Sequence, residues 1–396
     1  MIFQTTIWIV ALLATSATAP CSSAYSATTL NRVEPIQEGV DQIRDDQWHL
    51  QFLNIAGAHR LSLGEDVLVA VPDTGVDQHP DLRNNLLPGI DIIPGGSGDG
   101  RSDRDSHGTS MAGLVAAHGR GENQGALGIA PRAKIVPIFD SPPHGEGDST
   151  ALAQAIDFAV ERGVDVISIS SSGNATPQLE RAVRTAMAAD IAIVAAAGNK
   201  PGDRRVAYPA SEEGVIAVGG ITRSGTYSEL SVSGPEIDLV APAVDIYSTS
   251  YGGKYSKGTG TSGATAIVAG AVALIRSKYP YLPAREVVHR LTATAIDKGP
   301  PGRDDEYGYG VIDIVAALTA DVPPLGFGSA TASAPAGGGP RTTAAAEPPG
   351  DGLGSDNAAT VRGLATLGVI VAAAVTWAVI VRRRRRGDDP PPRISR

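Results

Sequence analysis

Across its middle, this chain alternates short apolar runs with longer helical patterns. The apolar runs are nearly continuous, as expected of strands that are buried on both faces of a parallel sheet. Their alternation with helical stretches is typical of a sheet covered by helices. The sequence therefore predicts a three-layer α/β domain with a mostly parallel central sheet. The predicted strands are 67–71, 135–139, 164–170, 191–197 and 215–219, and the predicted helices are 108–117, 150–162 and 179–189.

The carboxyl-terminal region predicts a membrane anchor. Residues 363–381 form a run of 19 residues without a charge, about the length that a helix needs to cross a bilayer core. Five consecutive arginines, residues 382–386, follow at once and would hold that end in the cytoplasm. We therefore expect a transmembrane helix over residues 361–381 and an Arg-rich cytoplasmic tail over residues 382–396.

The amino-terminal region predicts export. Residues 7–13 are apolar and small residues follow, which is typical of a signal peptide over residues 1–27 whose cleavage site the sequence leaves open. No Lys or Arg precedes the apolar run, so an uncleaved anchor is the alternative. An exported N-terminus and one C-terminal span predict a single-pass protein of the cell membrane. Most of the chain, including the α/β domain, would then lie outside the cell. Cys21 is the only cysteine, so no internal disulfide can form.

Two polar segments border the predicted domain. Residues 28–47 are polar and charged, and predict either a propeptide or a permanent wrap around the domain. Their short length favours the wrap, because a folded inhibitory domain would need more residues. Residues 321–360 are rich in Pro, Ala and Gly and predict a flexible linker. The folded domain then covers residues 48–320. The formal charge of −9 gives no sign of the basic face that nucleic-acid binding needs.

Asp73 stands where an α/β site is expected, because it follows a predicted strand and precedes a turn glycine. An aspartate that only stabilises the turn is the alternative. Asp-Thr-Gly is also the signature of aspartic proteases, which need two such carboxylates. The chain has no second Asp-Thr-Gly or Asp-Ser-Gly, so an aspartic protease is disfavoured.

Three further polar residues have comparable settings. His107 opens a predicted helix among small residues that allow close backbone packing, and Ser262 begins an apolar helix whose free N–H groups could meet an oxyanion. Asn199 follows a buried strand and a glycine, and its amide could donate to the same oxyanion. Each alone could be structural, as a core histidine, a helix cap or a turn residue. Together with Asp73 they supply an acid, a base, a nucleophile and an amide donor.

These motifs resemble those of the subtilisin family. Asp-Thr-Gly at 73, His-Gly-Thr at 107, Ala-Ala-Gly-Asn at 196–199 and Gly-Thr-Ser at 260–262 match the family pattern, in the order Asp, His, Ser. The resemblance implies a subtilisin-like serine endopeptidase with protein or peptide substrates and the catalytic triad Asp73, His107 and Ser262. It also implies an oxyanion hole at Asn199 and a substrate-binding strand at Ser170, Ser171 and Ser172. The calcium sites of the family are not recognisable as a motif in this sequence, so we expect no required metal, and no cofactor. Ala266 departs from the family, which has a proline there.

The overall layout resembles the mycosins, membrane proteases of type VII secretion systems. A signal, a short arm, a subtilisin domain, a Pro-rich linker, one span and a basic tail follow in that order. This resemblance implies the secretion membrane complex as a partner. A mainly structural subunit of that complex and a general degradative protease are the alternatives.

Overall fold

A computed structural model describes residues 34–36, 39–143 and 147–325. Its largest element is a seven-stranded sheet in the order β3-β4-β2-β5-β6-β7-β8, and every neighbouring pair in it is parallel. All five predicted strands are present with small shifts at their ends, so the prediction of a mostly parallel sheet is confirmed. The strands are β2 (Leu68–Asp73), β3 (Ile90–Asp91), β4 (Lys134–Phe139), β5 (Val166–Ile169), β6 (Ala192–Ala196), β7 (Ile216–Ile221) and β8 (Leu239–Pro242).

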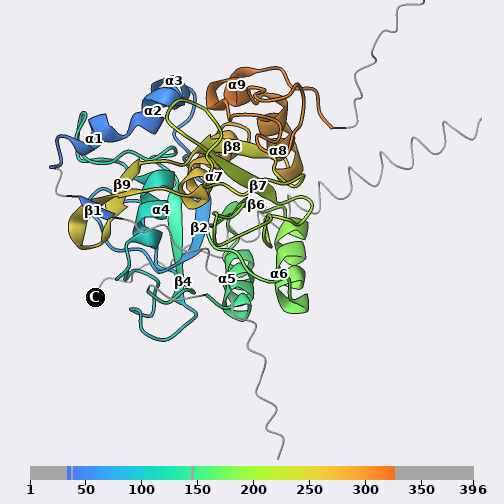
Figure 1. The fold of residues 1–396 in the computed structure, drawn as a ribbon. Coiled ribbons are helices and arrows are strands. Elements are labelled where there is room, and N and C mark those ends of the chain that lie inside the picture. The colour runs from blue at the N-terminus through green and yellow to red at the C-terminus, as the bar shows by residue number, and fades with distance from the viewer. Residues whose placement is uncertain (1–33, 37–38, 144–146, 326–396) are drawn as a thin grey trace, which may run out of the picture. The chain divides into compact units, whose positions relative to one another are not determined.

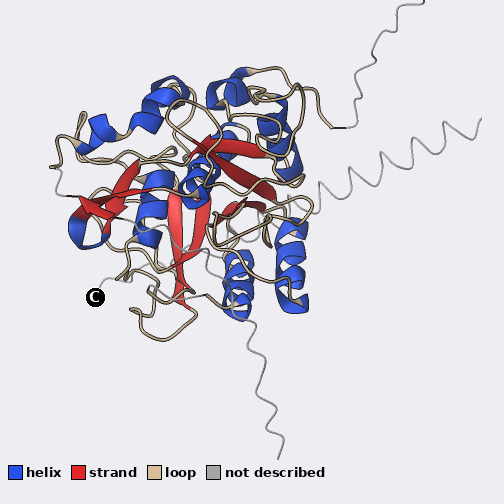
Figure 2. Ribbon diagram, viewed as in Figure 1, coloured by secondary structure: helices blue, strands red, loops and turns tan. Residues whose placement is uncertain are grey.

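Helices cover both faces of this sheet (Figures 1 and 2). Along β2, Val69 and Val71 belong to one apolar core while Ala70 belongs to the other. Because successive side chains of a strand point to opposite faces, two buried faces require the nearly continuous apolar runs of the sequence. The first face carries α4 (His107–Ala116), α7 (Thr261–Lys278), α8 (Ala284–Ala293) and α9 (Ile314–Thr319), and the second carries α5 (Ser149–Glu161) and α6 (Pro177–Ala188).

A second, three-stranded antiparallel sheet lies beside α4 and was not predicted. Strands β9 (Ile246–Ser250) and β10 (Lys254–Gly258) form a hairpin through the short helix η1 (Tyr251–Gly253), and β1 (Glu34–Ile36) pairs with β10. The sequence of β10, Lys-Tyr-Ser-Lys-Gly, lacks the apolar run by which the other strands were recognised. Strands built from polar residues lack the apolar pattern that identifies a strand in a sequence, even where they are buried, as most of β9 is.

The amino-terminal segment packs on the domain through three short helices, α1 (Ile43–Asp46), α2 (Trp48–Phe52) and α3 (Ile55–His59). Gln47 is buried and donates from Nε2 to the Leu127 and Tyr247 carbonyls, at 3.0 and 3.2 Å. The Trp48 indole donates to the Asp245 carbonyl at 3.0 Å. The Gln47 bonds cross the predicted boundary between arm and domain, so packing is continuous there.

Several predicted segments lie outside the described residues. They are the signal at 1–27, the start of the arm, most of the linker, the span at 361–381 and the basic tail. Within 34–36, 39–143 and 147–325, no helix combines the length and apolarity that crossing a bilayer requires.

His49 makes the folded domain sensitive to acid. It is fully buried in α2, neither ring nitrogen has a hydrogen-bond partner among the described residues, and burial lowers its pKa to about 3. The unfolded chain takes up a proton below about pH 6.5 while the folded chain does not, so stability falls as the pH drops below that value. We expect a loss of about 2 kcal/mol from this residue between pH 7 and 5, measured by urea unfolding.

His49→Leu should remove this component of the pH dependence, because leucine fills a similar volume without titrating. His289→Leu, at a partly exposed histidine of α8, is the matched control and should retain it. Equal losses of stability in the wild type and His49→Leu would contradict the prediction.

Candidate active site

Asp73 and His107 form a buried pair at the carboxyl edge of the sheet. Asp73 ends β2 and His107 begins α4, and their exposed fractions are 5% and 3%. His107 Nδ1 lies 2.8 Å from one Asp73 carboxylate oxygen and 2.9 Å from the other. The Thr74 N–H also donates to Asp73 Oδ1, at 2.7 Å. The carboxylate therefore directs the proton of the imidazole to Nδ1 and leaves Nε2 able to accept one.

Two opposing effects set the pKa of His107. Burial disfavours the imidazolium, while the charge and the hydrogen bond of Asp73 favour it. The second effect prevails, and the pKa of His107 lies above its ordinary value. The site thus contains a base whose protonated form is stabilised by a fixed carboxylate.

Asp103, which the sequence analysis missed, holds the start of α4. This buried carboxylate accepts hydrogen bonds from the Thr109 N–H at 3.0 Å and from the Thr74 hydroxyl at 3.1 Å. The Thr74 hydroxyl in turn accepts from the Gly108 N–H at 3.0 Å. Burial raises the pKa of Asp103. Its position four residues before His107, just outside a predicted helix, was the one sequence signal that could have identified Asp103 as part of the site.

Two of the small residues after His107, both glycines, are required by close contacts of α4 with neighbouring strands. A Cβ atom at Gly108 would collide with the Gly75 carbonyl oxygen and lie 3.1 Å from the Cβ of Asp73. A Cβ at Gly113 would collide with the Thr249 hydroxyl of β9. The close backbone packing expected from the small residues around His107 is thus present, and the approach of α4 to β2 and to the unpredicted β9 depends on these two glycines.

Ser262 is the second residue of α7 and faces the same cavity as His107. Both side chains line it, together with Met111, Leu114 and Gly263. The Ser262 hydroxyl donates to the Ser170 carbonyl at 3.2 Å. Hydrogen bonds of a catalytic serine are often loose before substrate binds, so rotation about one side-chain bond could redirect this hydroxyl. The helix start also leaves the Ser262 N–H without an intrahelical acceptor.

Asn199 follows β6 after Gly198, whose φ of 113° is a conformation that favours glycine. Its Oδ1 accepts from the Thr261 N–H at 2.9 Å, directly beside Ser262. The Asn199 N–H donates to Asp203 at 2.9 Å, which fixes the backbone. Since Oδ1 is used in this way, the Nδ2 group is the part of the amide left to donate to another acceptor.

The predicted substrate strand reaches the same edge of the sheet. Ser170 follows β5, and its hydroxyl donates to the Ser262 carbonyl at 3.5 Å. Ser171 and Ser172 are buried beside it, and Ser172 also lines a cleft of about 440 Å³ with Arg204 and Arg205. All seven residues selected from the sequence therefore lie at the carboxyl edge of the sheet or the adjoining helix starts.

Asp140 is a second acidic residue that the sequence analysis missed. It follows β4, and its N–H donates to the Asp73 carbonyl at 3.1 Å. Burial, aided by the charge of Asp73, raises the pKa of Asp140 well above its ordinary value. Its position directly after a predicted strand is the same signal that identified Asp73.

Ala266, where the family has proline, is fully buried within α7, and the helix continues through it. The described ranges contain no group of three or more His, Cys, Asp or Glu side chains that could hold a metal ion.

Comparison with known proteins agrees with this architecture. The model of the Peptidase_S8 subtilase family matches residues 64–310. The thermostable alkaline protease of Halalkalibacterium halodurans is 37% identical over 269 residues, which are 67% of this chain and 71% of that protein. Subtilisin DY of Bacillus licheniformis is 38% identical over 259 residues, 64% of this chain and 91% of the relative.

Solved structures of mycosins are also similar. MycP1 from Mycobacterium smegmatis superposes with a TM-score of 0.64 at 28% identity, covering 76% of this chain and 90% of that one. The MycP3 protease from the type VII (ESX-3) secretion system gives a TM-score of 0.62 at 32% identity, covering 79% and 100%. With a family model that spans most of the folded domain, the chain belongs to the subtilase family and is a serine endopeptidase of the subtilisin type.

Proposed function

We propose that Ser262, His107 and Asp73 are the catalytic triad of this endopeptidase. The observation that carries the proposal is the buried contact of His107 Nδ1 with both Asp73 oxygens, while His107 and Ser262 line one cavity. Ser262 Oγ attacks the peptide carbonyl carbon and His107 Nε2 takes its proton. Asp73 keeps the imidazole in the required tautomer and stabilises its charged form.

The rest of the cycle uses the same groups. His107 gives the proton to the leaving amine as the carbon–nitrogen bond breaks, which leaves an acyl group on Ser262. A water molecule then gives a proton to His107 and attacks the acyl carbon. His107 returns this proton to Ser262 Oγ as the bond from Oγ to the acyl carbon breaks, which releases the acid and restores the serine hydroxyl. Asn199 Nδ2 and the Ser262 N–H stabilise the oxyanion of each tetrahedral intermediate. The hydrogen bond that Asn199 Oδ1 accepts from the Thr261 N–H supports this role, because it orients the amide.

We further propose that Ser170, Ser171 and Ser172 hold the substrate as an extended strand. Ser170 contacts Ser262 through both its carbonyl and its hydroxyl, so a peptide beside this segment would pass the nucleophile. Extended peptides bind to such edges through main-chain hydrogen bonds.

The proposed setting is the outer side of the cell membrane. The predicted signal, the span at 361–381 and the five arginines support a single-pass protein with its catalytic domain outside. The similarity to MycP1 and MycP3 supports an association with a type VII secretion membrane complex, whose exported proteins would be the substrates. Nucleic acid is not an expected partner.

Covalent labelling tests the proposed chemistry. A fluorophosphonate probe should modify the full-length protein at Ser262, because an activated serine attacks phosphorus as it attacks a carbonyl. Peptide mass spectrometry locates the adduct. Prior denaturation should abolish labelling, since the triad exists only in the fold. A folded protein that stays unlabelled, or is labelled at another serine, would contradict the assignment.

The predicted anchor is also consistent with a structural role in the membrane complex. A secretion assay separates this role from proteolysis. Deleting the whole protein should impair export by the secretion system if the system needs the protein at all. If processing is the essential task, Ser262→Ala should impair export to the same extent. Normal export with Ser262→Ala but not with the deletion would instead identify a structural subunit.

A further inference from the structure

Asp103 is a buried carboxylate beside the start of α4 that takes no part in the proposed reaction cycle. It is 6% exposed, and each of its oxygens accepts more than one hydrogen bond. Oδ1 accepts from the Asp105 N–H at 2.8 Å, the Ser106 N–H at 3.1 Å and the Thr74 hydroxyl at 3.1 Å. Oδ2 accepts from the N–H and the hydroxyl of Thr109, at 3.0 and 2.5 Å.

The backbone sets the direction of the two hydroxyls that bond Asp103. The Thr74 hydroxyl accepts from the Gly108 N–H at 3.0 Å, and the Thr109 hydroxyl accepts from the Asp77 N–H at 2.9 Å. The proton of each hydroxyl is then directed to Asp103. The carboxylate therefore joins two segments of the chain, the turn after β2 and the start of α4.

The start of α4 is held from outside the helix. The first N–H groups of a helix have no acceptor within it and need one elsewhere. The Thr109 N–H donates to Asp103, and the Gly108 N–H donates to the hydroxyl that bonds Asp103. The Ser106 side chain, at the usual capping position, makes no capping bond to the helix. Asp103 thus supplies the cap that the residue at this position does not.

Ser106, the residue before His107, has a φ of 92°, in the left-handed region that residues other than glycine rarely adopt. Such a conformation persists only where the surroundings impose it. Here the Ser106 N–H donates to Asp103, and the Ser106 hydroxyl lies 2.8 Å from that of Ser250 on β9. These two contacts fix the direction in which the chain enters α4, and with it the point from which the His107 side chain extends.

We propose that Asp103 is a positioning residue of the protease: by joining the turn after β2 to the start of α4, it holds the His107 imidazole against Asp73. The inference rests on the proposed triad, and Asp103 acts through His107 rather than on the reacting atoms. A small displacement of a reacting group lowers the rate of the chemical step steeply. Because substrate binding depends on other residues, the loss of Asp103 should lower kcat and leave KM nearly unchanged.

Asp103→Asn in the full-length protein tests the proposal. Whichever way the amide is turned, its NH₂ group meets at least two of the donors that now bond Asp103, so part of the network is lost. We expect kcat for a peptide substrate to fall about 100-fold. Titration of Ser262 with a fluorophosphonate counts the active sites, so that kcat refers to folded enzyme alone.

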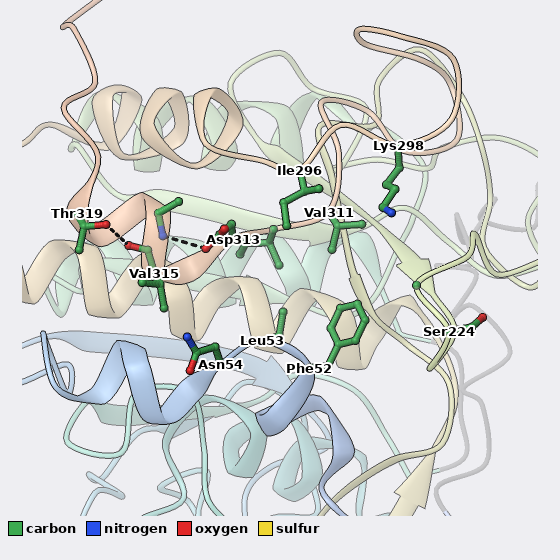
Figure 3. A pocket seen from close by; sticks show the side chains of 13 residues that line it. Phe52, Leu53, Asn54, Ser224, Ile296, Lys298, Val311, Asp313, Val315 and Thr319 are labelled. Atoms are coloured by element: carbon green, nitrogen blue, oxygen red, sulfur yellow. Dashed lines mark hydrogen bonds between the residues drawn. The ribbon is translucent and has the colours of Figure 1, made fainter.

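Asp313→Asn is the matched control. Asp313 accepts from the Ala316 N–H at the start of α9, at 2.8 Å, and lines a groove of about 640 Å³ that no residue of the candidate active site lines (Figure 3). Both variants replace a carboxylate at a helix start by its amide and remove the same charge from the helix dipole. Only Asp103→Asn should lower kcat, because a loss of helix stability alone does not displace His107.

The pH profile separates positioning from stability. Burial lowers the pKa of His107, and the charge of Asp73 on β2 raises it. The charges of Asp105 and Asp103, in the loop before α4, raise it further. Removing the charge of Asp103 therefore lowers this pKa, and the acid limb of kcat/KM should move to lower pH. A change in stability alone would leave the limb in place.

Thr109→Val decides the question if Asp103→Asn does not fold. It keeps the shape of the side chain but removes the hydroxyl bond to Asp103, and we expect kcat to fall about tenfold. Thr109→Ser, which restores the hydroxyl, should recover the activity.

Three results would overturn the positioning role. They are a folded Asp103→Asn protein with the kcat of the wild type, an acid limb that this variant leaves unmoved, and full activity of Thr109→Val. A wild-type protein that the fluorophosphonate does not label at Ser262 would instead overturn the proposed triad, so the two failures are distinct.

Discussion

Ser262→Ala is expected to lower kcat for peptide hydrolysis by about 10⁶-fold, the loss measured in subtilisin when the nucleophile is removed. The change deletes one hydroxyl whose recorded contact is the Ser170 carbonyl, so the fold should persist. Activity of the purified protein on a peptide substrate, with thermal unfolding in parallel, measures both effects.

The comparison needs a serine of no proposed catalytic role. Ser97→Ala removes a hydroxyl that bonds Asp99 in an exposed loop, and it should retain full activity. Residual activity of Ser262→Ala within tenfold of the wild type would rule out Ser262 as the nucleophile.

Asp73→Asn is expected to lower kcat by about 10⁴-fold, as the equivalent change does in serine proteases. An amide can donate to His107 Nδ1, which would move the imidazole proton to Nε2 and remove the base. The fall in kcat should therefore be much larger than the fall caused by removing a charge from the protein surface. Steady-state kinetics measures it, with Asp45→Asn, at an exposed carboxylate of α1, as the control.

The same variant should shift the pH profile. The active form needs neutral His107. Burial lowers the pKa of His107, but Asp73, together with the nearby charges of Asp105 and Asp103, raises it above the ordinary histidine value, so wild-type kcat/KM falls with decreasing pH through that raised pKa. Without the carboxylate charge, burial remains and lowers that pKa, so the acid limb moves to lower pH. A limb that stays in place would show that Asp73 does not control the charge of His107.

The main elements of the fold could be predicted because burial leaves a pattern in the residues. Strands β2 and β6 are apolar almost throughout, since both faces of the sheet are covered. The antiparallel hairpin of β9 and β10 was missed because its strands consist largely of Ser, Thr, Tyr and Lys, although most of β9 is buried. Asp103 and Asp140 stand beside a predicted helix and a predicted strand, but acids in such positions are also common in ordinary loops. Their burial, which only the tertiary structure shows, sets them apart.

The sequence by itself determined which chemical groups are present and in what order: an acid at 73, a base at 107, an amide at 199 and a nucleophile at 262. These are properties of single side chains and short motifs, so they can be read without coordinates. The tertiary structure decided how the groups meet. The contact of His107 Nδ1 with Asp73, the orientation of the Asn199 amide by the Thr261 N–H, and the balance that raises the pKa of His107 all join residues far apart in the chain. They depend on the register of parallel strands and on close packing of helix starts, which no local pattern of residues specifies.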